Sequence, residues 1–339
     1  MTAAGRYAEL AAAVRSFKAE LIQPSQLERF LESGSLAEIV STITGGRITS
    51  VDASDLSPVE SLLVQRSMEL AKRLASYAPQ DSRPLVNHFS KGFEYACVKE
   101  ILKASSDHVD PEEALRHIVP AGKFTADRCK DLIESHNPNR VIESIDDEAL
   151  RRFVAPKLTG ERASFQTVAA IDQYYFMKMW AASNLPDPLD AQSAKGLIGE
   201  AIDHLNILLA LRARQMGLDA RTASETMIPI NYSLGQAFNE LPEANNVQNL
   251  ERILEKTRYA NSFQAGMTLD GGRVECELNR SHAEACLNMF AGSPFNVGLA
   301  LAFLFLKSYE LRDLFSLVNA KANNLPAERV LESLIRRTS

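Results

Sequence analysis

The chain has 339 residues, of which 45% are hydrophobic and 24% charged, as is typical of globular proteins that bury a large core. Its formal net charge is −6 at pH 7, and no segment concentrates the Lys and Arg side chains that a phosphate backbone or an anionic lipid surface attracts. These features argue against a nucleic-acid-binding protein and against a direct lipid anchor.

The N-terminal segment and the cysteines predict a reduced, cytoplasmic protein. Residues 1–21 read as an amphipathic helix carrying Glu9 and Glu20, and they lack the basic patch and apolar block of a signal peptide. The cysteines lie within helical patterns at spacings that match no disulfide framework, so we expect all four to be reduced packing residues: Cys97, Cys129, Cys276 and Cys286.

The first third of the chain is predicted to be helical throughout. Apolar residues recur at steps of three and four, Ser57-Pro58 marks one helix start, and Gly45-Gly46 marks one helix end. The pattern predicts helices over 7–22, through 27–31, and over 36–43, 59–77 and 85–104.

Helical patterns continue through the middle of the chain. They predict helices over 112–119, 125–135, 141–154, 164–183 and 195–216, the last one ending at Gly217. The helix over 164–183 is apolar on most faces and holds the single tryptophan, Trp180, so we expect it in an interior. The segment 184–190, NLPDPLD, is interpreted as a break.

The last third is organised around one long helix over 293–324. Ser293 is a candidate cap, Pro294 suits the first turn, and Asn323-Asn324 suits the end. The apolar run from Val297 to Leu306 is too short for a membrane span, so we expect it to be buried in protein. Further helices are predicted over 233–241, 250–258, 274–290 and 327–337, with a turn at 270–272. Because no alternating run favours a strand, the predicted fold class is all-α.

Six acidic residues in matching order indicate an internal repeat. Each follows an apolar or aromatic residue in a helical pattern, and the second acid of each block lies 31 to 35 residues after the first. The first acids are Glu60, Asp172 and Glu275, and the second acids are Glu94, Asp203 and Glu310. We predict three similar helical domains, 1–108, 109–219 and 220–339, in a funnel with pseudo-threefold symmetry around a central hollow. Any single pair is also explained by an acid near a helix start.

Catalytic motifs are absent from the sequence, which contains no HExxH, phosphate-binding loop, GxSxG or dinucleotide turn. The best candidate metal cluster is Cys276, His282 and Cys286, and the favoured alternative is two core cysteines and a half-exposed histidine. The run 146–148, Asp-Asp-Glu, suggests a magnesium site, but an exposed acidic patch is the favoured interpretation.

Two further groups have a functional and a structural interpretation. The aromatic and methionine residues of 174–180 could line a cofactor cavity, although helix packing is favoured. The second acids could ring the hollow and meet a basic partner, although helix capping and pairing with Lys99, His204 and Arg312 is favoured. The remaining histidines, which show no nucleophile and base spacing, are His88, His108, His117 and His136.

Three segments, 6–22, 199–219 and 293–335, resemble the C subunits of archaeal-type (A/V-type) ATP synthases, which are the counterparts of the d subunit of the vacuolar ATPase. The resemblance covers essentially the whole chain and rests on packing patterns. The sequence departs from the family at 43–46, where relatives tend to carry a threonine-tyrosine pair, while Thr257-Arg258-Tyr259 keeps something similar.

The resemblance implies a funnel of three helical domains that acts as a non-catalytic rotor subunit in the central stalk. Its partners would be the central shaft subunits and the cytoplasmic face of the membrane c/K ring, so the protein would be peripheral at the cytoplasmic face of the membrane. It would transmit torque for ATP synthesis or ion pumping, with no catalytic, cofactor or metal residues. Two alternatives are a helical scaffold or adaptor unrelated to ATPases, and an all-helical enzyme using Asp146 and Asp147.

Overall fold

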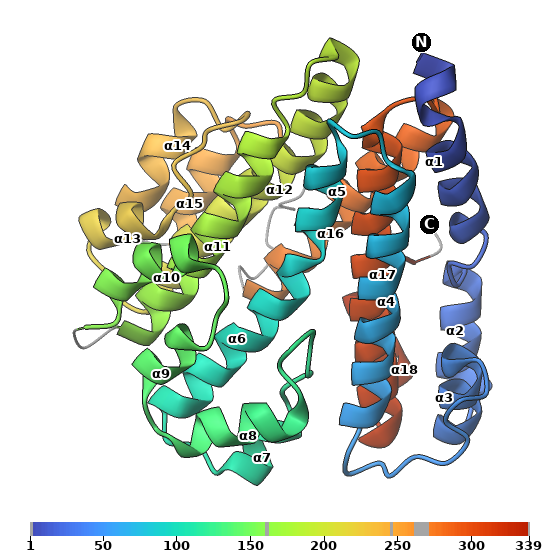
Figure 1. The fold of residues 1–339 in the computed structure, drawn as a ribbon. Coiled ribbons are helices and arrows are strands. Elements are labelled where there is room, and N and C mark those ends of the chain that lie inside the picture. The colour runs from blue at the N-terminus through green and yellow to red at the C-terminus, as the bar shows by residue number, and fades with distance from the viewer. Residues whose placement is uncertain (1–2, 160–162, 245–246, 261–270, 338–339) are drawn as a thin grey trace.

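The computed structural model describes residues 3–159, 163–244, 247–260 and 271–337 (Figure 1). In these ranges the regular elements are helices, and β pairing is confined to two isolated bridges, Asp52 with Asp55 and Ala121 with Phe124. The predicted all-α class is confirmed. Within the same ranges, no helix combines the length and the apolar character that crossing a bilayer requires.

The first part of the chain forms six helices: α1 (Ala3–Lys18), α2 (Pro24–Ser33), α3 (Leu36–Thr44), α4 (Ser57–Tyr77), α5 (Arg83–Phe89) and α6 (Lys91–Ser106). The predicted starts and stops at Ser57 and Gly45 are confirmed, since α4 begins at Ser57 and Gly45 ends α3 with a φ of 63°. The first helix ends at Lys18 rather than Ile22, whose N–H donates instead to Glu310 Oε1 at 2.6 Å.

The single helix predicted over 85–104 is wrong, because α5 and α6 are separate helices that meet at Ser90. The Tyr175 hydroxyl donates to the Phe89 carbonyl at 3.3 Å, and the N–H of Phe93 bonds back to Ser90. A Cβ added to Gly92 would lie 3.1 Å from the Tyr175 hydroxyl, so the ring fits closely against the junction. The junction is therefore held both by local bonds and by a side chain that is distant in sequence.

The middle of the chain forms short helices followed by a long one: α7 (Pro111–Leu115), α8 (Ala126–Glu134), α9 (Pro138–Glu143), α10 (Glu148–Val154), the 3-10 turn η1 (Ala155–Lys157) and α11 (Ala163–Ala182). Thr125 caps α8, in agreement with the predicted start. The helix predicted over 141–154 is wrong, since Asp147 accepts from the N–H of Leu150 and starts a new helix there. In α11 most faces are covered, but Met177 is exposed and Trp180 is half-buried.

The next helix, α12 (Pro188–Gln215), begins well before the predicted residue 195. Asp187 accepts from the amides of Leu189 and Asp190, and Pro188 occupies the first turn, so the segment interpreted as a break contains the helix start. The predicted stop at Gly217 is confirmed by its φ of 65°. Four short elements follow: α13 (Ala220–Thr226), α14 (Ala237–Glu240), η2 (Leu241–Glu243) and α15 (Val247–Leu254).

The C-terminal part consists of α16 (Gly271–Asn288), η4 (Met289–Ala291), α17 (Val297–Ala322) and α18 (Ala327–Ser333). Gly271 and Gly272 belong to α16 rather than to the predicted turn, whose first residue, Asp270, lies outside the described residues. The predicted helix over 327–337 ends early, at Ser333, because the N–H groups of Ile335 and Arg336 donate to Asp313.

The predicted cap at Ser293 is wrong, and a residue on another helix supplies it. Helix α17 starts at Val297, whose N–H donates to Asp190 Oδ1 of α12 at 3.0 Å. The other carboxylate oxygen of Asp190 accepts from the Tyr7 hydroxyl at 2.6 Å. One buried carboxylate therefore joins α1, α12 and α17.

Helix α17 belongs to both of the two largest cores. Its first half, 297–306, is buried without interruption with apolar residues of α1, α5 and α12, as predicted for the apolar run. Its second half packs with α2, α3, α4 and α18. Figure 1 shows the last long helix beside the first ones, so the two ends of the chain share a core. The domain boundaries at 108 and 219 stay predictions.

Candidate functional site

A cleft of about 490 Å³, here called the central cleft, lies where six helices meet: α5, α6, α11, α12, α16 and α17. Long helices pack in pairs around the central cleft. The pairs are α6 with α11, α12 with α16, and α17 with α4, which lies outside the cleft. The central cleft therefore collects side chains from regions of the chain that are more than 200 residues apart.

Aromatic side chains form much of the floor of the central cleft. Tyr175 stacks on His88, with ring centroids 5.2 Å apart, and lies edge-on to Phe176. Phe305 is edge-on to His282 with centroids 4.7 Å apart, and Tyr309 also lines the cleft. Rings in offset or edge-on contact make a rigid apolar surface. Tyr175 and Phe176 of the predicted aromatic group thus line a cleft, whereas Tyr174, Met179 and Trp180 pack between helices.

The rim of the central cleft carries ion pairs that involve two of the first acids of the predicted repeat. Asp172 of α11 pairs with Lys99 of α6 at 2.6 Å, and Glu275 of α16 pairs with Arg212 of α12 at 3.1 Å. Glu275 also binds Arg312 of α17 at 2.7 Å. The two arginine side chains remain 45% and 48% exposed, so these pairs are weak and are open to exchange with an incoming partner.

The remaining first acid, Glu60, is buried away from the rim. It accepts from Asn319 Nδ2 at 2.9 Å, a bond that links α4 to α17. Burial raises the pKa of Glu60, and the bond from Asn319 lowers it again in part. Each first acid therefore connects the two long helices of one pair.

Asp203 fixes a loop rather than facing the central cleft as a free charge. Its carboxylate accepts from the N–H groups of Tyr232 and Ser233 and from the Ser233 and Tyr259 hydroxyls, at 2.8 to 3.1 Å. Burial raises the pKa of Asp203, and these bonds oppose that shift. The predicted pairing with His204 is wrong. The motif 257–259 noted in the sequence supplies one of the donors, Tyr259.

The other second acids also contact the backbone of connecting segments. Glu310 accepts from the N–H of Ile22 and pairs with Lys307 and Arg336, and not with Arg312 as predicted.

Glu94 pairs with Lys91 at 3.0 Å, and its predicted partner, Lys99, is taken by Asp172. A Cβ added to Gly122 would lie 2.3 Å from Glu94 Oε1, so Glu94 fills the space beside that turn. The three second acids therefore have structural partners, as favoured, although not the expected ones.

Two polar groups that face the central cleft are unpartnered. His204 is 4% exposed, and no described residue pairs with its Nε2 or with Nδ2 of Asn279. Burial lowers the pKa of His204 well below its usual value, with a further contribution from His282, so the ring is neutral at physiological pH. A buried polar atom without a partner costs about 1–3 kcal/mol. Neighbouring atoms cover both groups, so an incoming hydrogen-bonding group recovers that cost only when the side chain turns toward the cleft.

The candidate metal cluster does not assemble. His282 is fully buried and not half-exposed as expected: its Nδ1 lies 2.5 Å from the Tyr309 hydroxyl and its Nε2 lies 3.0 Å from the Leu197 carbonyl. Both ring nitrogens are therefore used, and burial lowers the pKa of His282 to about 4. Cys276 contacts the Ser333 carbonyl and Cys286 is buried. Across the described ranges, no three His, Cys, Asp or Glu residues are arranged to hold a metal ion.

The acidic run 146–148 is likewise structural, and it is not simply an exposed patch. Asp147 caps α10 and accepts from the Tyr174 hydroxyl at 2.9 Å, while Asp146 pairs with Lys123 and Glu148 with Arg152.

Of the other histidines, His88 bonds the Tyr175 carbonyl, and His108 lies against His136 with centroids 4.8 Å apart. His117 is exposed. None of these rings lies in the central cleft.

Residues 10–333, which are nearly the whole chain, match the ATP synthase (C/AC39) subunit family. The chain belongs to that family. Relatives include the A-type ATP synthase C subunit of Methanocaldococcus jannaschii, which is 23% identical with 97% of this chain and 86% of the relative covered.

The A-type C subunit of Methanobrevibacter smithii is also 23% identical, with 97% of this chain and 88% of the relative covered. That of Pyrococcus horikoshii is 20% identical over 95% of this chain and 88% of the relative. The chain is thus a subunit of an archaeal-type rotary ATPase by family, and the interpretation as an unrelated scaffold is set aside.

Proposed function

We propose that this chain is the non-catalytic central-stalk component that couples the rotating shaft to the membrane ion-carrying ring and transmits torque between them. Family membership supports a place in an archaeal-type rotary ATPase. The further proposal is that the three helical domains, 1–108, 109–219 and 220–339, form a funnel whose mouth receives the lower end of the shaft and whose opposite face sits on the cytoplasmic side of the c/K ring.

The central cleft carries the proposal, because its lining suits a protein partner. An aromatic floor, exchangeable ion pairs at the rim and two unpartnered polar atoms give an apolar centre with a polar edge, as in protein interfaces. One turn of helix, about 10 Å across and 5.4 Å long, displaces roughly 400 Å³. A cleft of about 490 Å³ therefore admits about one turn at the shaft tip.

The mechanical role follows from the way the helices are joined. A torque-transmitting part must not deform, and packed interiors have low compressibility. In this chain α17 runs through both large cores, and the carboxylates of Asp190 and Asp203 connect helices to distant segments. These links make the body stiff without a reactive group.

The test is reconstitution of the rotary complex with and without this protein in sealed vesicles. ATP hydrolysis by the head should persist without the chain, while ATP-driven ion transport should be lost and should return when the purified chain is added. Transport at the full rate without the chain, or loss of hydrolysis by the detached head, would contradict the proposal.

A further inference from the structure

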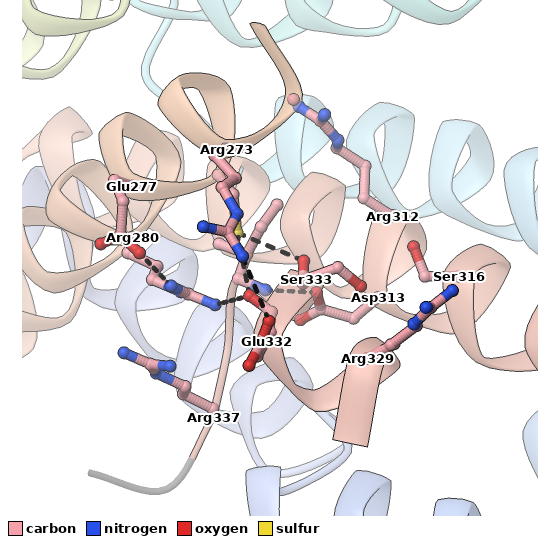
Figure 2. A pocket seen from close by; sticks show the side chains of 13 residues that line it. Arg273, Glu277, Arg280, Arg312, Asp313, Ser316, Arg329, Glu332, Ser333 and Arg337 are labelled. Carbon is pink, nitrogen blue, oxygen red and sulfur yellow. Dashed lines mark hydrogen bonds and ion pairs between the residues drawn. The ribbon is translucent and has the colours of Figure 1, made fainter. Parts of the chain in front are cut away.

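A second cleft, here called the arginine cleft, lies between α16, α17, α18 and the segment 334–337, with a volume of about 640 Å³ (Figure 2). Five arginines line it: Arg273, Arg280, Arg312, Arg329 and Arg337. Three acids line it as well: Glu277, Asp313 and Glu332. The cleft therefore has more cationic than anionic side chains, whereas the whole chain carries a net charge of −6.

The wall of the arginine cleft is held in place by buried polar groups. Arg280 is 9% exposed and donates through Nε and Nη2 to the Leu334 carbonyl, at 2.9 and 2.7 Å. Asp313 is 1% exposed and accepts from the N–H groups of Ile335 and Arg336, at 2.7 and 3.0 Å. The segment after α18 is thus fixed from both sides, which lowers the entropic cost of binding a partner against it.

The outer arginines of the cleft are free to meet a ligand. Arg329 and Arg337 are exposed, and neither has an ion-pair partner among the described residues. Arg273 reaches Glu332 only at 3.5 Å, with the two side chains 58% and 70% exposed, so this pair is weak.

The placement of these charges decides the kind of ligand. In Figure 2 the guanidinium groups of Arg312, Arg329 and Arg337 lie at separate edges of the cleft and point in different directions. One phosphate group is best bound by guanidinium groups that converge on it in bidentate geometry. Separated cations instead match carboxylates spaced along a chain.

We propose that the arginine cleft binds an acidic, Glu- or Asp-rich segment of another polypeptide. Such a segment lies across α16, α17 and α18, and its carboxylates meet Arg273, Arg329 and Arg337. The site is distinct from the central cleft, although Arg312 lines both. It therefore gives the protein a second contact, in addition to the proposed contact with the shaft.

Fluorescence anisotropy with the full chain and a fluorescein-labelled peptide of about ten glutamates tests this inference. The wild-type chain should bind the peptide, and Arg329→Glu with Arg337→Glu should weaken binding about tenfold, because two attractions become repulsions. Arg329→Lys with Arg337→Lys should keep most of the affinity. Both arginines are exposed, so the fold should survive, and thermal melting by circular dichroism checks this.

A matched control makes the same charge change elsewhere. Arg116 and Arg140 are exposed and lie outside the arginine cleft, so Arg116→Glu with Arg140→Glu should change the affinity less than twofold. An equal loss in both double variants, or no binding by the wild-type chain at low salt, would overturn the proposal. So would binding of inorganic triphosphate at this site without binding of the peptide, since the site would then recognise a small anion.

Discussion

Replacement of Asp190 by alanine should destabilise the fold more than the loss of an ordinary helix cap. The carboxylate is 2% exposed and accepts from the first amide of α17 and from the Tyr7 hydroxyl. Loss of a cap costs about 1 kcal/mol, and a buried hydroxyl group whose proton loses its acceptor costs about 1–3 kcal/mol. The free energy of unfolding should therefore fall by about 2–4 kcal/mol.

Urea unfolding followed by circular dichroism measures this change, and a double-mutant cycle with Tyr7→Phe isolates the side-chain contact. The coupling energy between Tyr7 and Asp190 should be about 0.5–3 kcal/mol. Asp187→Ala is the matched control, because Asp187 caps α12 and otherwise makes only a long ion pair with Arg6, at 3.8 Å, so its loss should cost about 1 kcal/mol. If Asp190→Ala costs no more than Asp187→Ala, the reasoning about the link between three helices is refuted.

Three further experiments test packing, ionisation and the central cleft. Gly199→Ala places a Cβ 2.3 Å from Cγ of Tyr232 and should lower the free energy of unfolding by about 1–3 kcal/mol. In Gly196→Ala the nearest atom lies at 3.9 Å, so this variant should gain up to about 1 kcal/mol. Similar melting temperatures of the two variants would contradict this expectation. Burial raises the pKa of Asp313 to about 6, so the folded state holds a proton that the unfolded chain has released, and stability should fall as pH rises from about 4 to 6. Asp313→Asn should flatten that slope in urea midpoints taken across this pH range, and an unchanged slope would contradict the assignment. His204→Leu removes an unpartnered buried nitrogen, so the melting temperature should stay unchanged or rise. The same substitution should weaken binding of the shaft subunits about tenfold in titration calorimetry. A lower melting temperature with unchanged binding would show a structural role instead.

Features that depend on nearby residues were predictable from the sequence. The all-α class follows from the helical spacing of apolar residues along the chain. The helix start at Thr125 and the stops at Gly45 and Gly217 each involve residues within one turn of the helix end. Features that depend on distant residues were not. The start of α17 is set by Asp190, which lies 107 residues earlier, and the break at Ser90 involves Tyr175, which lies 86 residues after Phe89. Periodicity contains no information about such contacts.

The candidate site shows the same division. The predicted repeat singled out acids that contact other helices or connecting segments, because their recurring positions are visible in the sequence. The partners of these acids depend on how the helices pack. The sequence contains no sign of the unpartnered nitrogen of His204, because a helical pattern does not show whether the ring nitrogens of a histidine have hydrogen-bond partners. The arginines of the second cleft come from three helices and a terminal segment, so no local basic run revealed them.

The position of α17 in both cores also bears on synthesis of the protein by the ribosome. Helices α1 to α4 are complete at residue 77, but the helix that covers them begins only at residue 297. At roughly 5–20 residues per second, the intervening chain takes roughly 10–45 s to make. Helices α1, α3, α4 and α5 can pack with one another during that time, but the apolar faces that α17 covers in the finished protein stay without their native partner until the last helices emerge.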